Sequence, residues 1–514
     1  MKHDQNLMNN RHKSNHDVSD NASSPSLSRR NVLGMGAGLG AAIATSASPS
    51  LGWAQNVDAT GKPLLDLTRD PTSPLSPLPP QLPAKAKRVI YLHMGGGLSH
   101  LDLFDYKPEL VKFDGKEAPQ ALLEGKQFPF ITGKPTLMGP LFPFHQAGES
   151  GAWVSDRFPQ LEKHIDDICF IKSMRSTQFN HVPAILLKLT GDARPGYPSL
   201  GAWVNYALGT VNQNLPGFIQ LNGPYLSDDN SPESQYWGSG FLPSAYQGMV
   251  CQARGEPILY LDNPPGVERK ERRHVLDAIA KINQQTLDEF NDPETLARSA
   301  QFEMAYRMQA EAPEAMDVSN EPQWVLDMYG AEPGRADFAM NCLLARRLAE
   351  RGVRFTQLWQ WGWDSHGTSQ VEALNDGFIN MCDIVDQPVA ALLSDLKMRG
   401  LLEDTLVVFS TEFGRTSMKE PSFGDLAQWS GRDHNPGGFT IWMAGAGIKG
   451  GTSYGETDEL GLDVVSNPVE VRDLHATILH ALGFDHHALT YRYQGLDQKI
   501  TGVKPARVIH DLFV

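Results

Sequence analysis

The sequence predicts an α/β protein with a mostly parallel central sheet and helices on both of its faces. Two observations lead to this prediction. Short runs that are almost wholly apolar alternate along the chain with longer segments of helical periodicity. Strands that are apolar on both sides are typical of a parallel sheet that is covered on both faces. The runs that predict strands are residues 88–93, 168–172, 353–359, 405–410 and 439–444.

The helical periodicity is strongest between residues 266 and 350, which predicts a helical insertion within the sheet domain. Glycines follow three of the predicted helices directly, as is common where a helix ends (Gly352, Gly400 and Gly483). Residues 215–260 are rich in glycine and proline and predict loops with short strands. Helices are predicted at residues 199–208, 275–290, 293–310, 336–351, 372–399 and 471–482, and residues 158–165 form a shorter amphipathic segment.

Residues 1–54 predict an export signal instead of a part of the folded domain. Residues 1–27 are polar and lack a hydrophobic period, which is typical of disorder. Arg29 and Arg30 then precede a weakly apolar stretch, residues 34–47, that is too short to span a bilayer. Paired arginines in this position indicate a twin-arginine signal, so the predicted partner is the twin-arginine export machinery and the predicted location is periplasmic or secreted. The alternative is a chance arginine pair before a flexible linker.

The folded domain is predicted to span residues 88–514, after cleavage behind Ala54 and a proline-rich lead-in over residues 55–87. No segment beyond the signal reaches the roughly 18 apolar residues of a membrane span, so no stable span is expected in the mature protein. The formal net charge of −15 does not suit a nucleic-acid binder, which must neutralise phosphates. The four cysteines lie far apart in the sequence, which favours buried thiols and leaves two disulfides as the alternative.

Acidic and imidazole side chains lie near the ends of the predicted strands, where functional groups gather in an open α/β sheet. Asp102 comes after the first strand, and Asp364 and His366 come after the third. Glu412 comes after the fourth strand, and His434 lies just before the fifth. Imidazole and carboxylate groups together form a ligand set for zinc, manganese or iron. These five side chains are therefore the predicted metal ligands, and the predicted cofactor is a divalent metal, zinc or manganese.

The segment after the second strand predicts groups that act on the substrate. Thr177 offers a hydroxyl nucleophile, and Asn180 and His181 follow it closely. Two metals can flank a phosphoryl or sulfuryl group and stabilise the attacking and leaving oxygens. Arginines hold such an anion through paired hydrogen bonds. The predicted anion-binding residues are Arg175, Arg415 and Arg432.

Each of these residues has a structural alternative. Asp102 can be a charge at a helix N-terminus, which the helix dipole favours. Glu412 can form a local ion pair with Arg415, Thr177 can be an ordinary loop hydroxyl, and His181 can be a core histidine behind a helix cap. The joint placement of these groups at four or five strand ends favours a functional site over these separate explanations. The remaining candidates can serve as turn caps: Asp364, His366 and His434.

The segments that carry these residues resemble one known family. The segments are LHMGGGLSHLDLFDYKPEL, NHVPAILLKLTGDARPGYPSLGAWVNYALG, LLARRLAERGVRFTQLWQWGWDSHGT, TEFGRT and GRDHNPGGFTIWMAGAGIKGG. Together they resemble the DUF1501 family, a bacterial group of exported, mostly uncharacterised proteins related to sulfatases and alkaline phosphatases. The resemblance covers about residues 88–510. It implies an alkaline phosphatase-like fold, with a central sheet between helices and one site built from both halves of the chain.

Several positions depart from the pattern of that superfamily. Its sulfatase-type enzymes carry a hydroxyl or modified cysteine at a helix N-terminus, followed by a TG turn. The LTG segment at residues 189–191 resembles this turn and implies a nucleophile position near residues 177–180, where cysteine is absent. The superfamily's metal-binding Asp-His pair is replaced by Glu412-Phe413, which removes one ligand. The first strand ends in three glycines where Asp-Gly is usual, which leaves Asp102 as a displaced carboxylate.

The leading hypothesis is an exported hydrolase of phosphate or sulfate esters, acting on a small-molecule or glycan ester with one or two divalent metals. The alternative is a non-catalytic binding protein of the same fold that holds a glycan, an anion or a protein partner. The replaced Asp-His and Asp-Gly pairs favour this alternative. A metal site requires the side-chain tips of Asp364, His366, Glu412 and His434 to lie within about 5 Å of one point.

Overall fold

The computed structural model describes residues 74–514, apart from residues 126–127, 132, 224–232, 252–257, 259–260, 291–292 and 422–427. The predicted signal over residues 1–54 lies outside the described residues, as does the first part of the lead-in. In the part of the chain that the structure describes, no helix combines the length and the apolar character needed to cross a membrane. Residues 74–87 lead to the first strand, and the buried Ala86 donates its backbone N–H to Ala481 O (2.8 Å).

A nine-stranded sheet forms the centre of the protein. Its strands are β1 (Arg88–Gly95), β5 (Ile168–Arg175), β6 (Phe218–Asn222), β7 (Met249–Cys251), β8 (Phe355–Trp361), β9 (Thr405–Ser410), β12 (Phe439–Ala444), β13 (Thr452–Tyr454) and β16 (Val469–Glu470). The order is β13, β5, β12, β9, β1, β8, β6 and β7, and β16 pairs with β5. β12 runs antiparallel to both of its neighbours, whereas the other pairings are parallel. The prediction of a mostly parallel α/β sheet is therefore confirmed.

The strands begin and end close to the predicted residues, and β9 and β12 have the predicted bounds. β8 begins at Phe355 instead of residue 353, because Val353 N donates to Leu348 O and so belongs to the end of the preceding helix. β1 extends to Gly95, which pairs with Trp361 of β8. Two short strands, β6 and β7, lie in the segment that predicted loops with short strands.

Helices connect most of the strands. The helices are α1 (Pro108–Lys112), α2 (Gln120–Leu123), α3 (His181–Thr190), α4 (Leu200–Leu208), α5 (Arg269–Phe290), α6 (Pro293–Met316), α7 (Gln323–Tyr329), α8 (Phe338–Glu350), α9 (Gly377–Met398) and α10 (Val471–Ala481). α9 begins later than predicted, because Gly377 N donates to Gln370 O and closes a turn there. α6 runs beyond the predicted residue 310 because the helix continues through Pro313, whose carbonyl accepts from Asp317 N. The amphipathic segment predicted at residues 158–165 forms a 3₁₀ helix, η2 (Leu161–Asp167).

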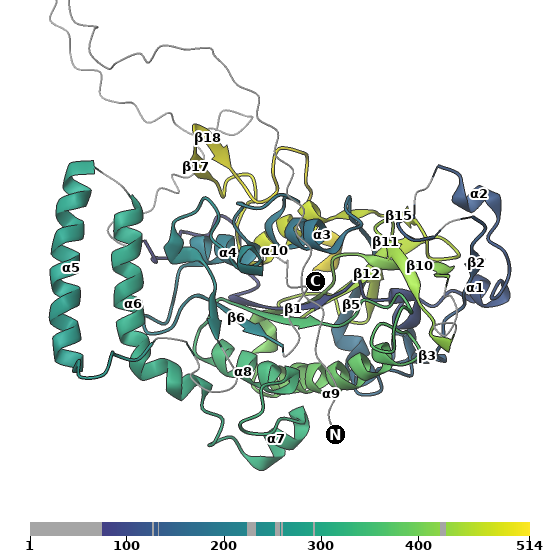
Figure 1. Cartoon of the computed structure of the whole chain (residues 1–514), viewed down its shortest axis with the longest axis horizontal. Coiled ribbons are helices and arrows are strands. Elements are labelled where there is room, and N and C mark those ends of the chain that lie inside the picture. The colour runs from purple at the N-terminus through teal and green to yellow at the C-terminus, as the bar shows by residue number, and fades with distance from the viewer. Residues whose placement is uncertain are drawn as a thin grey trace, which may run out of the picture. The chain divides into compact units, whose positions relative to one another are not determined.

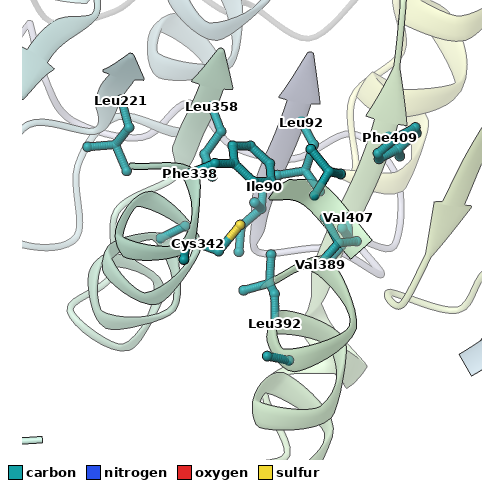
Figure 2. Close-up of a cluster of buried hydrophobic side chains, with 14 of the residues drawn as sticks. Ile90, Leu92, Leu221, Phe338, Cys342, Leu358, Val389, Leu392, Val407 and Phe409 are labelled. Atoms are coloured by element: carbon teal, nitrogen blue, oxygen red, sulfur yellow. The ribbon is translucent and has the colours of Figure 1, made fainter. Parts of the chain in front are cut away.

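Alternate residues of β1 face opposite layers of helices. Ile90 and Leu92 lie in a core cluster with α8 and α9, whereas Val89 and Tyr91 lie in a second cluster with α3, α4 and α10. Figure 1 shows α8 and α9 on one face of the sheet and the other three helices on the opposite face. Figure 2 shows the first cluster, where Leu221, Leu358, Val407 and Phe409 of the strands meet Phe338, Cys342, Val389 and Leu392 of the helices.

Helices α5 and α6 form most of the predicted insertion and pack against each other. Arg273 of α5 makes an ion pair with Glu303 of α6. Among the described residues of α5, Leu276 is the one buried side chain. α8, the last helix of that region, packs against β8 and so belongs to the helix layer of the sheet.

A three-stranded sheet, with strands β2 (Thr136–Leu137), β10 (Gly414–Lys419) and β11 (Arg432–Asn435), carries several predicted site residues. β10 follows β9, and β11 precedes β12. Because β12 is antiparallel, it begins at the edge of the main sheet where the parallel strands end. His434 is thereby brought to the edge that also carries Asp364 and Glu412. The two-stranded sheets pair β3 (Phe144–Ala147) with β4 (Ala152–Ser155), β14 (Glu456–Thr457) with β15 (Val464–Ser466), and β17 (Tyr491–Tyr493) with β18 (Leu496–Gln498).

All four cysteines are free and buried: Cys169, Cys251, Cys342 and Cys382. Burial raises the pKa of the Cys251 thiol to about 12, so this thiol stays protonated at neutral pH. The structure agrees with the interpretation of buried thiols and not with the alternative of two disulfides.

Candidate metal centre

Four side chains at the carboxyl edge of the sheet come together as a candidate metal centre: His181, Asp364, His366 and His434. One ligand atom from each lies within 4.8 Å of the others. His181 is the first residue of α3, Asp364 and His366 follow β8, and His434 lies in β11. The Nε2 atoms of His366 and His434 are 2.9 Å apart, and they lie 2.9 and 3.5 Å from Oδ1 of Asp364.

The hydrogen bonds on the far side of each imidazole ring determine its tautomer. The Nδ1 atom of each of the three histidines faces a carbonyl or carboxylate oxygen, which accepts hydrogen bonds. In each neutral ring the hydrogen is therefore on Nδ1, and Nε2 keeps a free lone pair. The three Nε2 atoms and the Asp364 carboxylate thus form a donor set of a kind that binds a divalent metal. The three bonds join His434 to Phe179 O (2.6 Å), His366 to the Glu420 carboxylate, and His181 to Glu412 Oε1 (2.7 Å).

Glu412 stands behind His181 instead of in the four-residue group. Its Oε1 accepts from His181 Nδ1 and from Gly96 N, at 2.7 and 2.9 Å. Its Oε2 accepts from Thr411 Oγ1 (3.1 Å) and lies 3.5 Å from Nε2 of the fully buried His93. The structure therefore places Glu412, a predicted direct ligand, behind His181 and outside the four-residue group.

Arg415 holds Asp364 in place. The fully buried guanidinium pairs with Asp364 Oδ1, and its Nε donates to Gly97 O (2.7 Å). The two remaining nitrogens donate to Gly96 O and Arg432 O. Every nitrogen of Arg415 has a protein partner, so the structure does not support the predicted role of this residue in holding a substrate anion.

Asp102 and Arg432 lie outside the four-residue group and pair with each other. Arg432 Nε donates to Asp102 Oδ2 (2.8 Å), and both side chains are fully buried. Arg432 also donates to Met138 O (2.8 Å) and Gly139 O (2.7 Å), and Ser99 Oγ donates to Asp102. Asp102 was a predicted metal ligand and Arg432 a predicted anion-binding residue, but in the structure they form a buried ion pair with each other.

The other predicted substrate-binding residues lie in the exposed segment before α3. Arg175, Thr177 and Asn180 are exposed, and no hydrogen bond in the described part of the chain joins their side chains to the four ligand groups. His181, predicted as a catalytic residue, is instead a member of the group. α3 ends in the LTG segment, where Gly191 takes a left-handed conformation (φ 81°).

Three residues around the centre escape sequence-based prediction: His93, Glu420 and Phe130. His93 lies inside an apolar strand, where a histidine is usually part of the core; its place just before the glycine-rich turn is the one available signal. Glu420 carries no sequence signal. Phe130 lies in a loop without periodicity, and its ring centre is 4.9 Å from that of His366.

Burial and neighbouring charges favour the metal-binding states of two of the four groups, His434 and Asp364. Burial, assisted by Arg415, lowers the pKa of His434 to about 3, so this ring is neutral at physiological pH. Burial alone would raise the pKa of Asp364. Arg415 and the three histidines outweigh that effect and hold the pKa well below its usual range. The centre therefore offers a carboxylate and at least one neutral imidazole before any metal binds.

Metal binding is expected to release protons. Burial lowers the pKa of His181, but hydrogen bonds to Asp364 and Glu412 outweigh burial and raise it to about 9. A metal must displace this proton, because only the neutral ring coordinates. The pKa of His366 is also raised, so the apparent zinc affinity is expected to rise by about tenfold or more per pH unit up to a pH of about 9. Calorimetric titration of the metal-free protein in buffers of different ionisation enthalpy measures the released protons, and a pH-independent affinity would contradict the assignment.

Replacing Glu412 with glutamine is expected to weaken metal affinity by about 10- to 100-fold, because it removes the charge that orients His181. Competition against a chelating dye measures the change, and circular dichroism checks the fold. Glu403→Gln, at an exposed position in a short 3₁₀ helix (Leu402–Asp404), is the matched control and should leave affinity unchanged. Equal affinities in the two variants would show that Glu412 does not support the centre.

Replacing Gly97 with alanine is expected to destabilise the protein by more than the same change at Gly400. Both glycines have a φ of +67°, which costs a non-glycine residue about 1–2 kcal/mol. A Cβ at Gly97 would also lie 2.4 Å from the Phe413 ring, whereas a Cβ at Gly400 meets nothing within 4 Å. Urea unfolding of the two variants measures the difference, and equal losses would mean that the Phe413 ring moves aside freely.

Comparisons with known proteins are informative about the family of the chain. The profile of a family described as "Protein of unknown function (DUF1501)" matches residues 86–513. The comparison with curated protein sequences gives no match. Among solved structures, a protein in the alkaline phosphatase superfamily from Vibrio parahaemolyticus is 13% identical, with a TM-score of 0.34, over 85% of this chain and 76% of that chain.

Two further solved structures are similar at the same level. The PsFucS1 sulfatase from Pseudoalteromonas sp. is 13% identical, with a TM-score of 0.31, over 77% of this chain and 68% of that chain. The phosphonate monoester hydrolase SpPMH from Silicibacter pomeroyi is 12% identical, with a TM-score of 0.29, over 63% of this chain and 68% of that chain. At these TM-scores, none of the likenesses assigns a reaction to this chain.

Proposed function

The chain belongs to the DUF1501 family, and we propose that it is a metal-dependent hydrolase of phosphate or sulfate esters. One observation carries the proposal: the side chains of His181, Asp364, His366 and His434 converge within 4.8 Å. Each imidazole is held from behind by an oxygen acceptor, as metal-binding histidines are. Neutral imidazoles with one carboxylate suit zinc or manganese.

A divalent metal in this centre would act as a Lewis acid and lower the pKa of a coordinated water. Three residues around the centre would support the metal ligands. Glu412 orients His181 and keeps its hydrogen on Nδ1, and Arg415 keeps the ligand carboxylate ionised. The buried Phe413 packs against the rings of His181 and His434, with ring centres at 4.9 and 4.5 Å, and excludes water from that side.

The attacking group in this proposal is water instead of a protein hydroxyl. Thr177 is exposed, and its hydroxyl contacts Gln178. Thr411 Oγ1 is occupied, since it accepts from Leu98 N and donates to Glu412. Within the described residues, no hydroxyl is hydrogen-bonded to the four ligand side chains. The ester is therefore expected to be cleaved in one step, without a covalent enzyme intermediate.

Metal analysis together with a substrate panel tests the proposal. The purified protein is expected to contain roughly one zinc or manganese per chain by inductively coupled plasma mass spectrometry, since its four ligands form one site. It should hydrolyse 4-nitrophenyl phosphate or 4-nitrophenyl sulfate, and EDTA should abolish this activity. A protein that binds neither metal and gains no activity with either would contradict the proposal and favour the binding-protein hypothesis.

We also propose that the twin-arginine signal exports the folded protein to the periplasm or the medium. The support is the Arg29-Arg30 pair ahead of a weakly apolar stretch. Replacing both arginines with lysine keeps the charge and removes the paired-arginine pattern. The variant is expected to stay in the cytoplasm on cell fractionation. Unchanged export would point to another route.

A further inference from the structure

Two phenylalanines beside the metal centre expose about half of their side chains, 52% for Phe130 and 51% for Phe179. The Phe130 ring centre lies 4.9 Å from that of His366 and 5.7 Å from that of His434, and its plane is nearly perpendicular to both. Phe179 reaches the centre through its backbone, because its carbonyl accepts from His434 Nδ1. The Phe130 ring therefore contacts two of the candidate ligand histidines, and the backbone of Phe179 holds its side chain next to one of them.

Hydrogen bonds from its own backbone and from the next residue fix the position of Phe130. The backbone N–H groups of Phe130 and Ile131 both donate to Asp433 Oδ2, at 2.9 and 3.2 Å. The Ile131 side chain is buried in a small core cluster, 7% exposed. Asp433 itself is buried in β11, next to His434. The exposed ring is thus tied to the strand that carries a ligand, and it presents a fixed apolar surface beside the centre.

The surroundings favour an apolar group over a polar one at this surface. Arg415 and Arg432, the buried cations beside the centre, already have protein partners at their nitrogens. A phenylalanine ring has no polar atom, whereas tyrosine and tryptophan combine an apolar body with a hydrogen-bond donor. A sugar ring needs partners for its hydroxyls, and Phe130 and Phe179 supply only carbon surface.

We propose that Phe130 and Phe179 form a subsite for an apolar aromatic alcohol, so that the substrates are aryl or arylalkyl esters. The inference rests on the proposed hydrolase function, because it places the acid part of the ester at the metal centre. The aromatic part then lies against the two exposed rings. Burying such a group in a matching subsite raises kcat/KM by about 10-fold or more over that of an ester without the group.

Benzyl and ethyl esters of phosphate and of sulfate test the proposal, since both are esters of primary alcohols and differ in the aromatic ring. The metal-loaded protein is expected to prefer the benzyl ester by about 10-fold or more in kcat/KM, and Phe130→Ala/Phe179→Ala should reduce this preference to less than about threefold. Phe302→Ala, which changes a 39% exposed phenylalanine on α6, is the control and should keep the preference. Calorimetry with benzylphosphonate and ethylphosphonate measures the same preference without turnover.

The outcomes separate the subsite from the hydrolase function. A benzyl preference in phosphonate affinity that disappears in the double variant, without hydrolysis of any ester, supports the subsite and contradicts the proposed function. Hydrolysis with equal rates for benzyl and ethyl esters supports the function and overturns the subsite. Binding of neither phosphonate in a protein that hydrolyses no ester overturns both. Faster hydrolysis of glucose 6-phosphate than of benzyl phosphate also overturns the subsite and assigns a sugar ester instead.

Discussion

Replacing Asp102 with alanine is expected to lower the free energy of unfolding by about 3–5 kcal/mol, although Asp102 makes no contact with the metal centre. The reason is that the change leaves the guanidinium of Arg432 buried and without its counter-ion. Both side chains of this pair are 0% exposed, so water cannot replace the lost carboxylate. Urea unfolding of the metal-free protein, followed by tryptophan fluorescence, measures the loss.

The control for this experiment is an ion pair of the same chemistry on the surface. Arg492 and Asp497 lie 3.1 Å apart, with side chains 67% and 43% exposed. Asp497→Ala is expected to cost less than about 1 kcal/mol, because solvent screens the pair. A loss at Asp102 as small as the loss at Asp497 would show that Arg432 finds another partner or becomes hydrated.

Replacing His434 with alanine is expected to reduce metal affinity by more than about 100-fold and to abolish metal-dependent hydrolysis. Removing a residue that hydrogen-bonds to a metal ligand lowers metal affinity by about 10- to 100-fold, and removing the ligand itself lowers it further. Burial keeps the ring neutral, so His434 is available for coordination without losing a proton. Mass spectrometry of the purified variant measures its metal content. His274→Ala, on the exposed face of α5, is the control and should bind metal normally. Full metal occupancy in the His434 variant would remove this residue from the ligand set.

The sheet could be predicted from the sequence because its strands are apolar on both faces and short. β9 and β12 have the bounds that their apolar runs predict. The direction of β12 could not be predicted in this way, since an apolar run looks the same in a parallel or an antiparallel strand. The placement of His434 depends on that direction. His434 precedes β12, and it lies at the edge where the parallel strands end only because β12 is antiparallel to its neighbours.

The predicted site residues and the four-residue group of the structure overlap in Asp364, His366, His434 and His181, and the differences between the two sets have one physical cause. The sequence shows which charged residues lie near strand ends, but not which of them neutralise one another. Asp102 and Arg432 are 330 positions apart and form a closed pair. Glu412 accepts a hydrogen bond from His181, and the four-residue group contains His181 instead of Glu412. The segment that follows β5 predicts a catalytic role for His181, whereas the structure brings its ring between the carboxylates of Asp364 and Glu412.

The reversed strand β12 also has a consequence for when the centre can exist. In the strand order, β12 is the link between β5 and β9, so it joins the part of the sheet that precedes His181 to the part that precedes Asp364. Until β12 has inserted, no strand pairing joins β5, which precedes His181, to the part of the sheet that contains β9, β1 and β8. Metal uptake should therefore be a late event in folding, and a bound ion would stabilise the finished sheet by mass action. Chains truncated before residue 439 are expected to remain metal-free even though all four ligands are present.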